Sequence, residues 1–142
     1  MVDTLAPSQR SERMSRVRGK NTKPELYVRR LLHGMGYRYR LHRRDLPGNP
    51  DIVFGKRRKA IFVHGCFWHR HPDPGCRLTR TPKSRLEFWE PKFAANVARD
   101  ARHQAALEAM GWKVLVVWEC ELVDKEQVKN ELRHFLEDNE RH

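Results

Sequence analysis

Residues 64–76 combine three histidines, two cysteines and two adjacent aromatic rings. A packed core has no need for this mixture, because each buried polar group would have to find a hydrogen-bond partner. Thiolates and imidazoles bind soft metal ions, imidazoles exchange protons near neutral pH, and aromatic rings stack on flat molecules. The segment therefore predicts a metal-braced site that acts on a flat and charged substrate.

Every cysteine of the chain can enter one metal site together with a nearby histidine: Cys66, His71, Cys76 and Cys120. One imidazole and three thiolates form a closed tetrahedral zinc shell, which is a common composition of structural sites. Since no coordination position stays open, we expect this zinc to brace the loop without taking part in chemistry. The alternative is three unrelated cysteines, one of them buried beside Trp118.

Two of the carboxylates before this segment are candidate functional groups, and each also has a structural explanation. Asp51 begins an expected strand directly after a turn rich in proline and glycine. A carboxylate there, with basic residues opposite, could seat a hard divalent cation against a phosphate. Asp51 could equally cap its Asn-Pro-Asp turn. Glu25 is completely explained as a member of a capping box that starts at Thr22.

The two remaining histidines of the segment could act on a phosphate. If His71 binds the zinc, His69 is free to take a proton from water, and His64 could donate to a phosphate oxygen. Asp100 lies in an expected helix, and it could orient an imidazole by a hydrogen bond without contacting the substrate itself. Taken alone, Asp100 is better explained as a surface aspartate paired with neighbouring arginines.

Two pairs of adjacent aromatic residues accompany these groups. Phe67 and Trp68 lie in the metal-braced segment, and exposed rings there would stack on bases, each contributing about 1–3 kcal/mol. Trp89 follows Phe88 at the start of an expected helix. An alternative places Trp89 and Phe93 in the core, because residues four apart share a helical face. We accept that alternative for Phe93.

Residues 1–20 are expected to form a flexible basic arm, followed by a single domain at 21–142. The basic side chains of the arm are Arg10, Arg13, Arg16, Arg18 and Lys20. Met14 is the large apolar side chain in the middle of the arm, and it could wedge between DNA bases. The alternative is a tail that is merely solvated.

The composition indicates a protein that binds a polyanion. The 142 residues carry a formal net charge of +11, and 39% of them are apolar, which is enough for one folded domain. Nucleic acid is the usual partner of such a charge, and an anionic membrane surface is a weaker alternative. The sequence has no apolar run of about twenty residues and no secretory signal, so we expect an intracellular protein without a membrane span.

The expected elements follow the order typical of a mixed sheet flanked by helices. Helices are expected at 22–36, at 84–110 with a break or restart at Pro91, and after the cap residue Asp124. The expected strands are Tyr37–Leu41, Asp51–Phe54, Lys59–His64 and Trp112–Trp118. The last of these is a continuous apolar run, so it should be buried on both faces.

Six stretches of the chain, in consistent order, resemble the very short patch repair endonucleases. They are residues 13–25, 46–53, 61–71, 88–89, 96–100 and 111–120, and they include His-Gly-Cys-Phe-Trp-His and the distant Trp-Glu-Cys. These two motifs together are specific, and the stretches extend over nearly the whole expected fold. The resemblance implies an α/β fold of the restriction-endonuclease-like type, with a mixed β-sheet flanked by helices and a zinc-braced loop.

The resemblance also implies a reaction. The substrate would be double-stranded DNA with a T:G mismatch left by deamination of 5-methylcytosine. The enzyme would nick one strand on the 5′ side of the thymine by magnesium-dependent hydrolysis. We expect a monomer in the bacterial cytoplasm, associated with the nucleoid, with other repair proteins acting after the nick.

By position, the resemblance assigns roles to the catalytic candidates: Asp51, His69, Asp100, His64 and Glu25. Asp51 would hold magnesium together with the main-chain carbonyl of Val63. His69 would be the general base, and Asp100 its orienting partner. The other two would support the phosphate and the water around the metal. The expected DNA contacts come from the arm and the aromatic pairs: Met14, Arg16, Arg18, Lys20, Phe67, Trp68 and Trp89.

Two rival hypotheses remain at this point. The chain could be a non-catalytic, zinc-stabilised DNA-binding module in which Asp51 and Glu25 keep only their turn and cap roles. It could also be a structure-specific nuclease of the same fold. Restriction-type sites usually carry a carboxylate-X-lysine on the second strand, where this chain has Val63-His64. We therefore expect weak magnesium binding in the absence of DNA.

Overall fold

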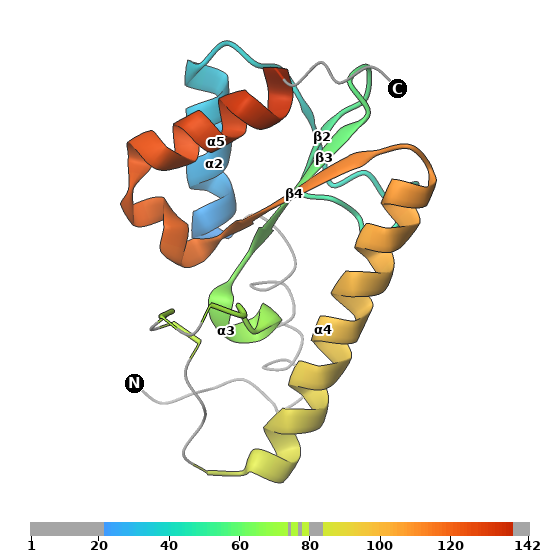
Figure 1. Cartoon of the computed structure of the whole chain (residues 1–142), viewed down its shortest axis with the longest axis vertical. Coiled ribbons are helices and arrows are strands. Elements are labelled where there is room, and N and C mark those ends of the chain that lie inside the picture. The colour runs from blue at the N-terminus through green and yellow to red at the C-terminus, as the bar shows by residue number, and fades with distance from the viewer. Residues whose placement is uncertain (1–21, 74, 77, 80–83, 138–142) are drawn as a thin grey trace, which may run out of the picture.

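A four-stranded sheet lies between two layers of helix in the computed structural model, which describes residues 22–73, 75–76, 78–79 and 84–137, without the side chain of Trp68 (Figure 1). The elements in chain order are α2 (Lys23–Gly34), β1 (Arg40–Leu41), β2 (Ile52–Phe54), β3 (Lys59–His64), α3 (Cys66–His69), α4 (Leu86–Ala109), β4 (Lys113–Trp118), the 3-10 helix η1 (Glu119–Val123) and α5 (Lys125–Glu137). The predicted order of helices and strands is therefore confirmed, with α3 and η1 added.

The sheet is mixed, as the sequence predicts. Its strand order is β1-β2-β3-β4, with antiparallel pairing from β1 to β3 and parallel pairing between β3 and β4. Parallel strands need a long crossover, and here α3 and α4 supply it. As a result the carboxyl ends of β3 and β4 lie side by side, with His64 opposite Trp118.

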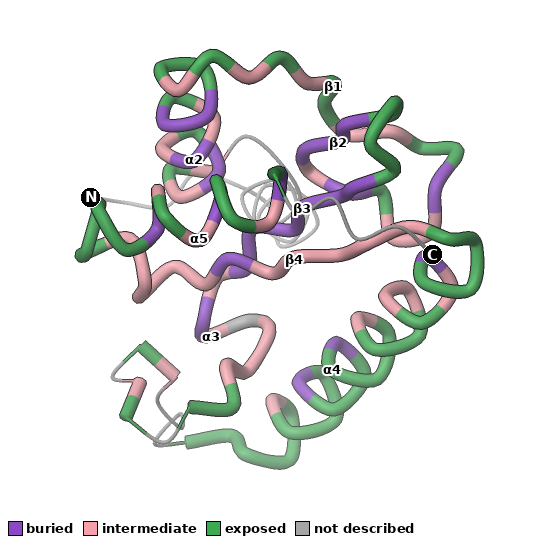
Figure 2. Tube along the Cα trace, turned by 45° about the horizontal axis from the view of Figure 1, so that its top comes forward, coloured by how far each residue is buried: buried purple, intermediate pink, exposed green. Residues whose placement is uncertain are grey.

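Strand β3 is the centre of the core, because alternate side chains on it point to opposite faces. Ile61 and Val63 pack with buried residues of α2 and α5 on one face. Ala60 and Phe62 pack with Leu107 of α4 on the other face. Figure 2 shows the buried residues concentrated along β3, whereas most of α4 is exposed on its outer side.

The prediction that the strand at Trp112–Trp118 is buried on both faces is wrong. In β4 Val117 is buried, at 2% exposure, and the other residues are half-buried. The reason is the strand order, which places β4 at the edge of the sheet. The doubly buried strand is instead β3, all six of whose residues are buried.

The helix that follows the metal-braced segment is not broken at Pro91. Helix α4 runs without interruption from Leu86 to Ala109 with Pro91 inside it. Proline removes one main-chain hydrogen bond in such a position. Pro91 and Glu87, whose carbonyl would have accepted that bond, are both exposed, so water can replace the missing donor.

Two predicted caps are present at the ends of helices. The hydroxyl of Thr22 accepts a hydrogen bond from the Glu25 amide at 3.3 Å, and Asp124 accepts one from the Gln127 amide at 3.1 Å. The apolar stripe predicted for the last helix is buried at Val128, Leu132 and Leu136, while Phe135 is half-buried.

The predicted basic arm at 1–20 lies outside the described residues, together with Met14, Arg16, Arg18 and Lys20. The division into an arm and one domain at 21–142 therefore stays a prediction. Within the described ranges, none of the helices is both long and apolar enough to cross a membrane.

Candidate active site and metal centre

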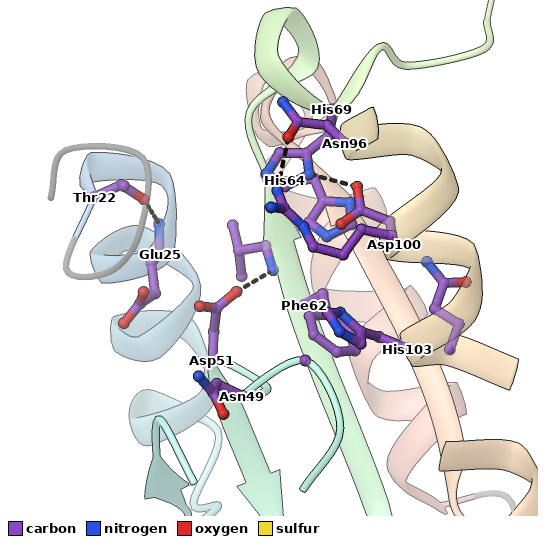
Figure 3. Close-up of a pocket in the computed structure, with 14 residues that line it drawn as sticks. Thr22, Glu25, Asn49, Asp51, Phe62, His64, His69, Asn96, Asp100 and His103 are labelled. Carbon is purple, nitrogen blue, oxygen red and sulfur yellow. Dashed lines mark hydrogen bonds and ion pairs between the residues drawn. The ribbon is translucent and has the colours of Figure 1, made fainter. Parts of the chain in front are cut away.

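A pocket of about 440 Å³ opens beside the carboxyl end of β3 (Figure 3). Helix α2 forms one wall, the turn before β2 forms the floor, and α4 forms the opposite wall. The residues that line it are Thr22, Glu25, Gly48, Asn49, Asp51, Phe62, Val63, His64, His69, Asn96, Arg99, Asp100, His103 and Gln104. All five predicted catalytic residues are among them, although they come from five separate segments of the chain.

Asp51 is held at the pocket by the neighbouring strand. Its Oδ2 atom accepts a hydrogen bond from the main-chain amide of Val63 at 2.8 Å. Burial raises the pKa of Asp51 to about 7, against the lowering effect of the Val63 amide, and the nearby Glu25 carboxylate raises it further. Burial and the neighbouring carboxylate disfavour the ionised form of Asp51, so a cation in the pocket would stabilise that form.

Glu25 has more than the cap role that the sequence offers. Its amide is bonded to Thr22, but its side chain is directed to the pocket and is almost fully buried, at 1% exposure. Oε2 of Glu25 lies 2.8 Å from Nε2 of His42 and 3.5 Å from a guanidinium nitrogen of Arg29. These two partners offset the cost of burying the carboxylate.

The structure brings His69 and Asp100 together across 31 positions of sequence. Nδ1 of His69 lies 2.6 Å from Oδ2 of Asp100, and both side chains are less than one-fifth exposed. Partial burial acts to raise the pKa of Asp100, but the hydrogen bond and charge of His69 lower it overall. Asp100 is therefore an ionised partner of the imidazole, and the alternative of a surface carboxylate paired with arginines does not describe it.

His64 is buried at the end of β3, with its ring stacked on that of His69 and edge-on to Trp118. Its exposure is 4%, and burial lowers the pKa of its imidazole to about 3, with a further lowering by His69 and an opposing effect of Asp100. His64 is thus neutral near physiological pH. Its Nδ1 atom is buried without a hydrogen-bond partner among the described residues. Any contact of His64 with a phosphate must use an N–H group, since the ring carries no positive charge.

The four predicted zinc ligands meet at one point next to the pocket. One ligand atom from each of Cys66, His71, Cys76 and Cys120 lies within 4.8 Å of the others. Nδ1 of His71 is 3.3 Å from the sulfur of Cys120 and 3.8 Å from that of Cys66. The cluster forms because Cys66 follows β3 and Cys120 follows β4, and these parallel strands end side by side.

The donors of this cluster suit a borderline or soft metal ion. Three sulfurs and one imidazole nitrogen match the composition of closed tetrahedral sites. Burial raises the pKa of the Cys66 and Cys120 thiols. Burial acts in the same sense on Cys76, but hydrogen bonds with Thr79 and His71 lower its pKa to about 6. The cluster can hold a metal ion, and the thiols whose pKa is raised need one to become thiolates.

Phe67 is less exposed than predicted from the sequence. It is half-buried and meets Phe93 and Trp89 edge-on, with ring centroids 5.2 and 6.1 Å away. Phe93 is buried, as predicted, and the guanidinium of Arg70 lies 4.2 Å from its ring centre. The physical reason is that α3 packs on the first turns of α4. Trp89 is half-buried in this cluster, and the Trp68 side chain is outside the described structure.

Several residues in the pocket or next to it are not predicted from the sequence. His42 has no signal in the sequence, because its partner Glu25 lies 17 positions away. On α4, the spacing of Asn96, Asp100 and His103 places three polar side chains on one helical face, and this periodicity could have identified them. Asn96 is 7% exposed and accepts a hydrogen bond from Arg99 at 2.7 Å.

The fold and the pocket define an endonuclease of the restriction-endonuclease-like class. A solved structure, the catalytic domain of the homing endonuclease I-Bth0305I, superposes with a TM-score of 0.57 and is 27% identical. The match covers 81% of this chain and 94% of that domain. The predicted fold class is therefore confirmed.

The chain belongs to the Vsr family of DNA mismatch endonucleases. The model of the family described as DNA mismatch endonuclease Vsr matches residues 2–74. The type II nicking enzyme V.XorIIP of Xanthomonas oryzae pv. oryzae is 58% identical over 96% of this chain and 98% of its own length. The DNA mismatch endonuclease Vsr of Escherichia coli is 40% identical over 92% of this chain and 82% of its own length. The prediction of a mismatch-repair endonuclease is confirmed.

Proposed function

We propose that this endonuclease hydrolyses one DNA strand on the 5′ side of the thymine in T:G mismatches that arise from deamination of 5-methylcytosine, and that it requires Mg2+. The observation that carries the proposal is the pocket itself. It gathers the Asp51 carboxylate, the buried Glu25 carboxylate and the His69–Asp100 pair from distant segments. A module that only binds DNA has no need for this arrangement.

Oxygen donors on the α2 side of the pocket suit a hard cation. Asp51, with the main-chain carbonyl of Val63, would hold Mg2+, and Glu25 stands beside them. When bound, Mg2+ neutralises charge on the scissile phosphate and eases departure of the leaving oxygen. The raised pKa of Asp51 is consistent with this role, because a cation stabilises its ionised form.

His69 is the proposed general base. Its Nδ1–H group donates a hydrogen bond to the ionised Asp100, which leaves the lone pair on Nε2. Nε2 can then take a proton from the attacking water, and Asp100 stabilises the imidazolium that results. Neutral His64 would donate a hydrogen bond from its N–H group to the phosphate, and Glu25 would orient water beside Asp51.

Selectivity for the mismatch is proposed to come from aromatic side chains near the pocket. Phe67, Trp68 and Trp89 would enter or flank the base stack, assisted by Met14 of the arm. Such insertion costs unstacking energy, and this cost is lower at a mispair. The basic residues of the arm (Arg16, Arg18 and Lys20) would contact phosphates.

The Cys66, His71, Cys76 and Cys120 cluster is proposed to hold structural zinc. All four positions around the ion are occupied by protein, so it would brace α3 and the segment that follows. Helix α3 carries His69, and the zinc would therefore support catalysis by holding this side chain in position. We further propose that the enzyme acts as a monomer in the bacterial cytoplasm, near the nucleoid, and that other repair proteins process the nick.

The test compares end-labelled duplexes that differ only at one base pair, T:G or T:A, incubated with protein and Mg2+. We expect a single nick 5′ of the mismatched thymine, dependent on Mg2+ and absent with Asp51→Asn. Equal cleavage of both duplexes would indicate a structure-specific nuclease. Binding without cleavage, unchanged by Asp51→Asn, would indicate a DNA-binding module.

A further inference from the structure

We propose that His42 is a positioning residue for the metal-binding carboxylates, acting through Glu25. This inference rests on the proposed use of a divalent cation at Asp51. Nε2 of His42 lies 2.8 Å from Oε2 of Glu25. By donating a hydrogen bond to that oxygen, His42 would fix the orientation of the Glu25 carboxylate beside Asp51.

His42 is bonded to both acidic residues, through its main chain to the main chain of Asp51 and through its side chain to the Glu25 carboxylate. Its main-chain amide donates to the carbonyl of Asp51 at 3.2 Å, so the pairing of β1 with β2 continues one residue past the strand. Its side chain bonds Glu25 on α2. One atom from each of the three side chains lies within 4.8 Å of the others. His42 is therefore the connection between helix α2 and the strand that begins after Asp51.

The backbone of His42 explains how its side chain reaches the helix. Its φ is +48°, in the left-handed region that few residues other than glycine, asparagine, aspartate and histidine adopt. This conformation ends β1 and turns the imidazole toward α2. A residue held in such a conformation at a functional site costs free energy that the surrounding contacts must offset. Here the bonds to Glu25 and Asp51 are those contacts.

Burial indicates that the imidazole is important to the orientation of Glu25. The glutamate side chain is 2% exposed and that of His42 is 20% exposed, so water competes little for the bond. Arg29 also faces Oε2 of Glu25, but at 3.5 Å, which is longer than the bond to His42. Since an ionised carboxylate only accepts hydrogen bonds, the imidazole must be the donor. Its Nε2 is thus engaged with Glu25, which favours action through that residue over direct ligation.

Three substitutions distinguish the two properties of His42 that could matter, which are a side chain long enough to bond Glu25 and a left-handed backbone. His42→Gln keeps an N–H group at a similar distance along the side chain. His42→Asn suits the left-handed backbone but is too short to reach Glu25. His42→Ala removes both properties. A positioning role predicts that Gln retains function and that Asn loses it, whereas a purely backbone role predicts the reverse.

The first measurement uses the full-length, zinc-loaded protein without DNA and with Mn2+ as the probe. Free Mn2+ is quantified by electron paramagnetic resonance during a titration. We expect the Asn and Ala variants to bind Mn2+ about tenfold or more weakly than the wild type, as is usual when an outer hydrogen-bond partner is lost. The Gln variant should stay within about threefold of the wild type. Equal weakening in Gln and Ala, or no weakening in any variant, would overturn the proposal.

A double-substitution cycle protects the test against variants that fold poorly. Glu25→Gln alone should weaken Mn2+ binding, and adding His42→Ala to it should cause little further loss, because the two residues act as one unit. Additive losses would contradict action through Glu25. Zinc content and circular dichroism are measured for each protein, so that only folded variants enter the comparison.

Nicking provides a second measurement, which distinguishes failure of the proposed function from failure of the role of His42. The Mg2+ concentration for half-maximal cleavage of the T:G duplex should rise in the Asn and Ala variants and be restored in Gln. If the wild type never cleaves T:G DNA but Mn2+ affinity follows the order wild type, Gln, then Asn and Ala, the proposed function fails and the role of His42 stands. If cleavage occurs normally and Mn2+ affinity is equal in all variants, the role of His42 fails alone.

Discussion

The imidazole of His64 lies parallel to that of His69, with ring centroids 3.9 Å apart and an angle of 5° between the planes. From His64 the ring contacts continue through Trp118 toward the metal centre. Trp118 meets His64 edge-on at 5.1 Å and stacks on His71 at 4.4 Å. A continuous set of four rings therefore connects the proposed general base to a proposed zinc ligand.

Replacing His69 by alanine should remove nicking without removing the metal of the cysteine cluster. His69 has the only imidazole bonded to Asp100 among the described residues, and loss of a general base costs about 100-fold to 10,000-fold in rate. Single-turnover nicking of a T:G duplex and zinc analysis of the same preparation provide the check. If zinc is lost as well, the roles of His69 and His71 have been exchanged.

Replacing Cys76 by alanine should give the opposite result. This change leaves a cluster of three ligands, so zinc content should fall and the melting temperature with it. Zinc is measured by elemental analysis and unfolding by circular dichroism. Thr79→Val is a suitable control, because it removes the hydroxyl that contacts the Cys76 sulfur at 3.3 Å but no ligand. A cysteine variant with full zinc and unchanged melting would argue against the cluster.

Asp51→Asn should make the Mg2+-free protein more stable at neutral pH. The folded protein holds the Asp51 proton up to a pKa of about 7, above the 3.8 that is usual for an aspartate. The carboxyl group therefore stabilises the fold below about pH 4, and this contribution is lost as the pH rises through 7, at about 1.4 kcal/mol per pH unit across that window. Asparagine keeps an oxygen for the Val63 amide but does not ionise.

Urea unfolding of zinc-loaded protein at pH 5, 6 and 7.5 measures this difference. The stability of the Asn variant relative to wild type should increase with each step in pH. The matched control is Asp45→Asn, since Asp45 is a largely exposed carboxylate with a pKa lowered by Arg43. The same pH dependence in wild type and Asp51→Asn would show that the burial of Asp51 has no such cost.

Gly48→Ala should destabilise the protein and weaken nicking together. Gly48 has a φ of +78°, and an added Cβ would lie 2.8 Å from Cβ of His103 on α4. The strain is expected to cost about 1–3 kcal/mol and to separate the turn before Asp51 from the helix that carries Asp100. Gly55→Ala is the control, because the nearest atom to its added Cβ is a side-chain nitrogen of Arg43 at 3.6 Å. Equal melting temperatures for both variants would contradict this account.

The helices, the strands and the chemistry of the site can be predicted from the sequence better than the arrangement of the elements in space. Helix caps at Thr22 and Asp124 depend on residues three positions apart, so local pattern is sufficient to find them. The exposure of β4 depends on which strand occupies the edge of the sheet, and this is not encoded in the strand's own residues. The uninterrupted course of α4 through Pro91 likewise depends on solvent at that position.

The candidate site shows the same division between local and long-range information. Residue type and spacing identify the ligands Cys66, His71 and Cys76, which are close in sequence. The role of His42 depends on a left-handed backbone and on a partner in another element, and neither is visible in a single sequence. Long-range polar pairs of this kind require the fold before they can be recognised.

The junction of Cys66 and Cys120 has a consequence for the unfolded chain. These residues are 54 positions apart, and the whole of α4 lies between them. An ion retained by both sulfurs during unfolding would close this stretch into a ring and restrict its conformations, as a covalent cross-link does. By the chain-entropy relation, a ring of that size disfavours the open ensemble by about 4 kcal/mol. The metal centre would then influence how readily α4, which forms one wall of the pocket, refolds after thermal unfolding.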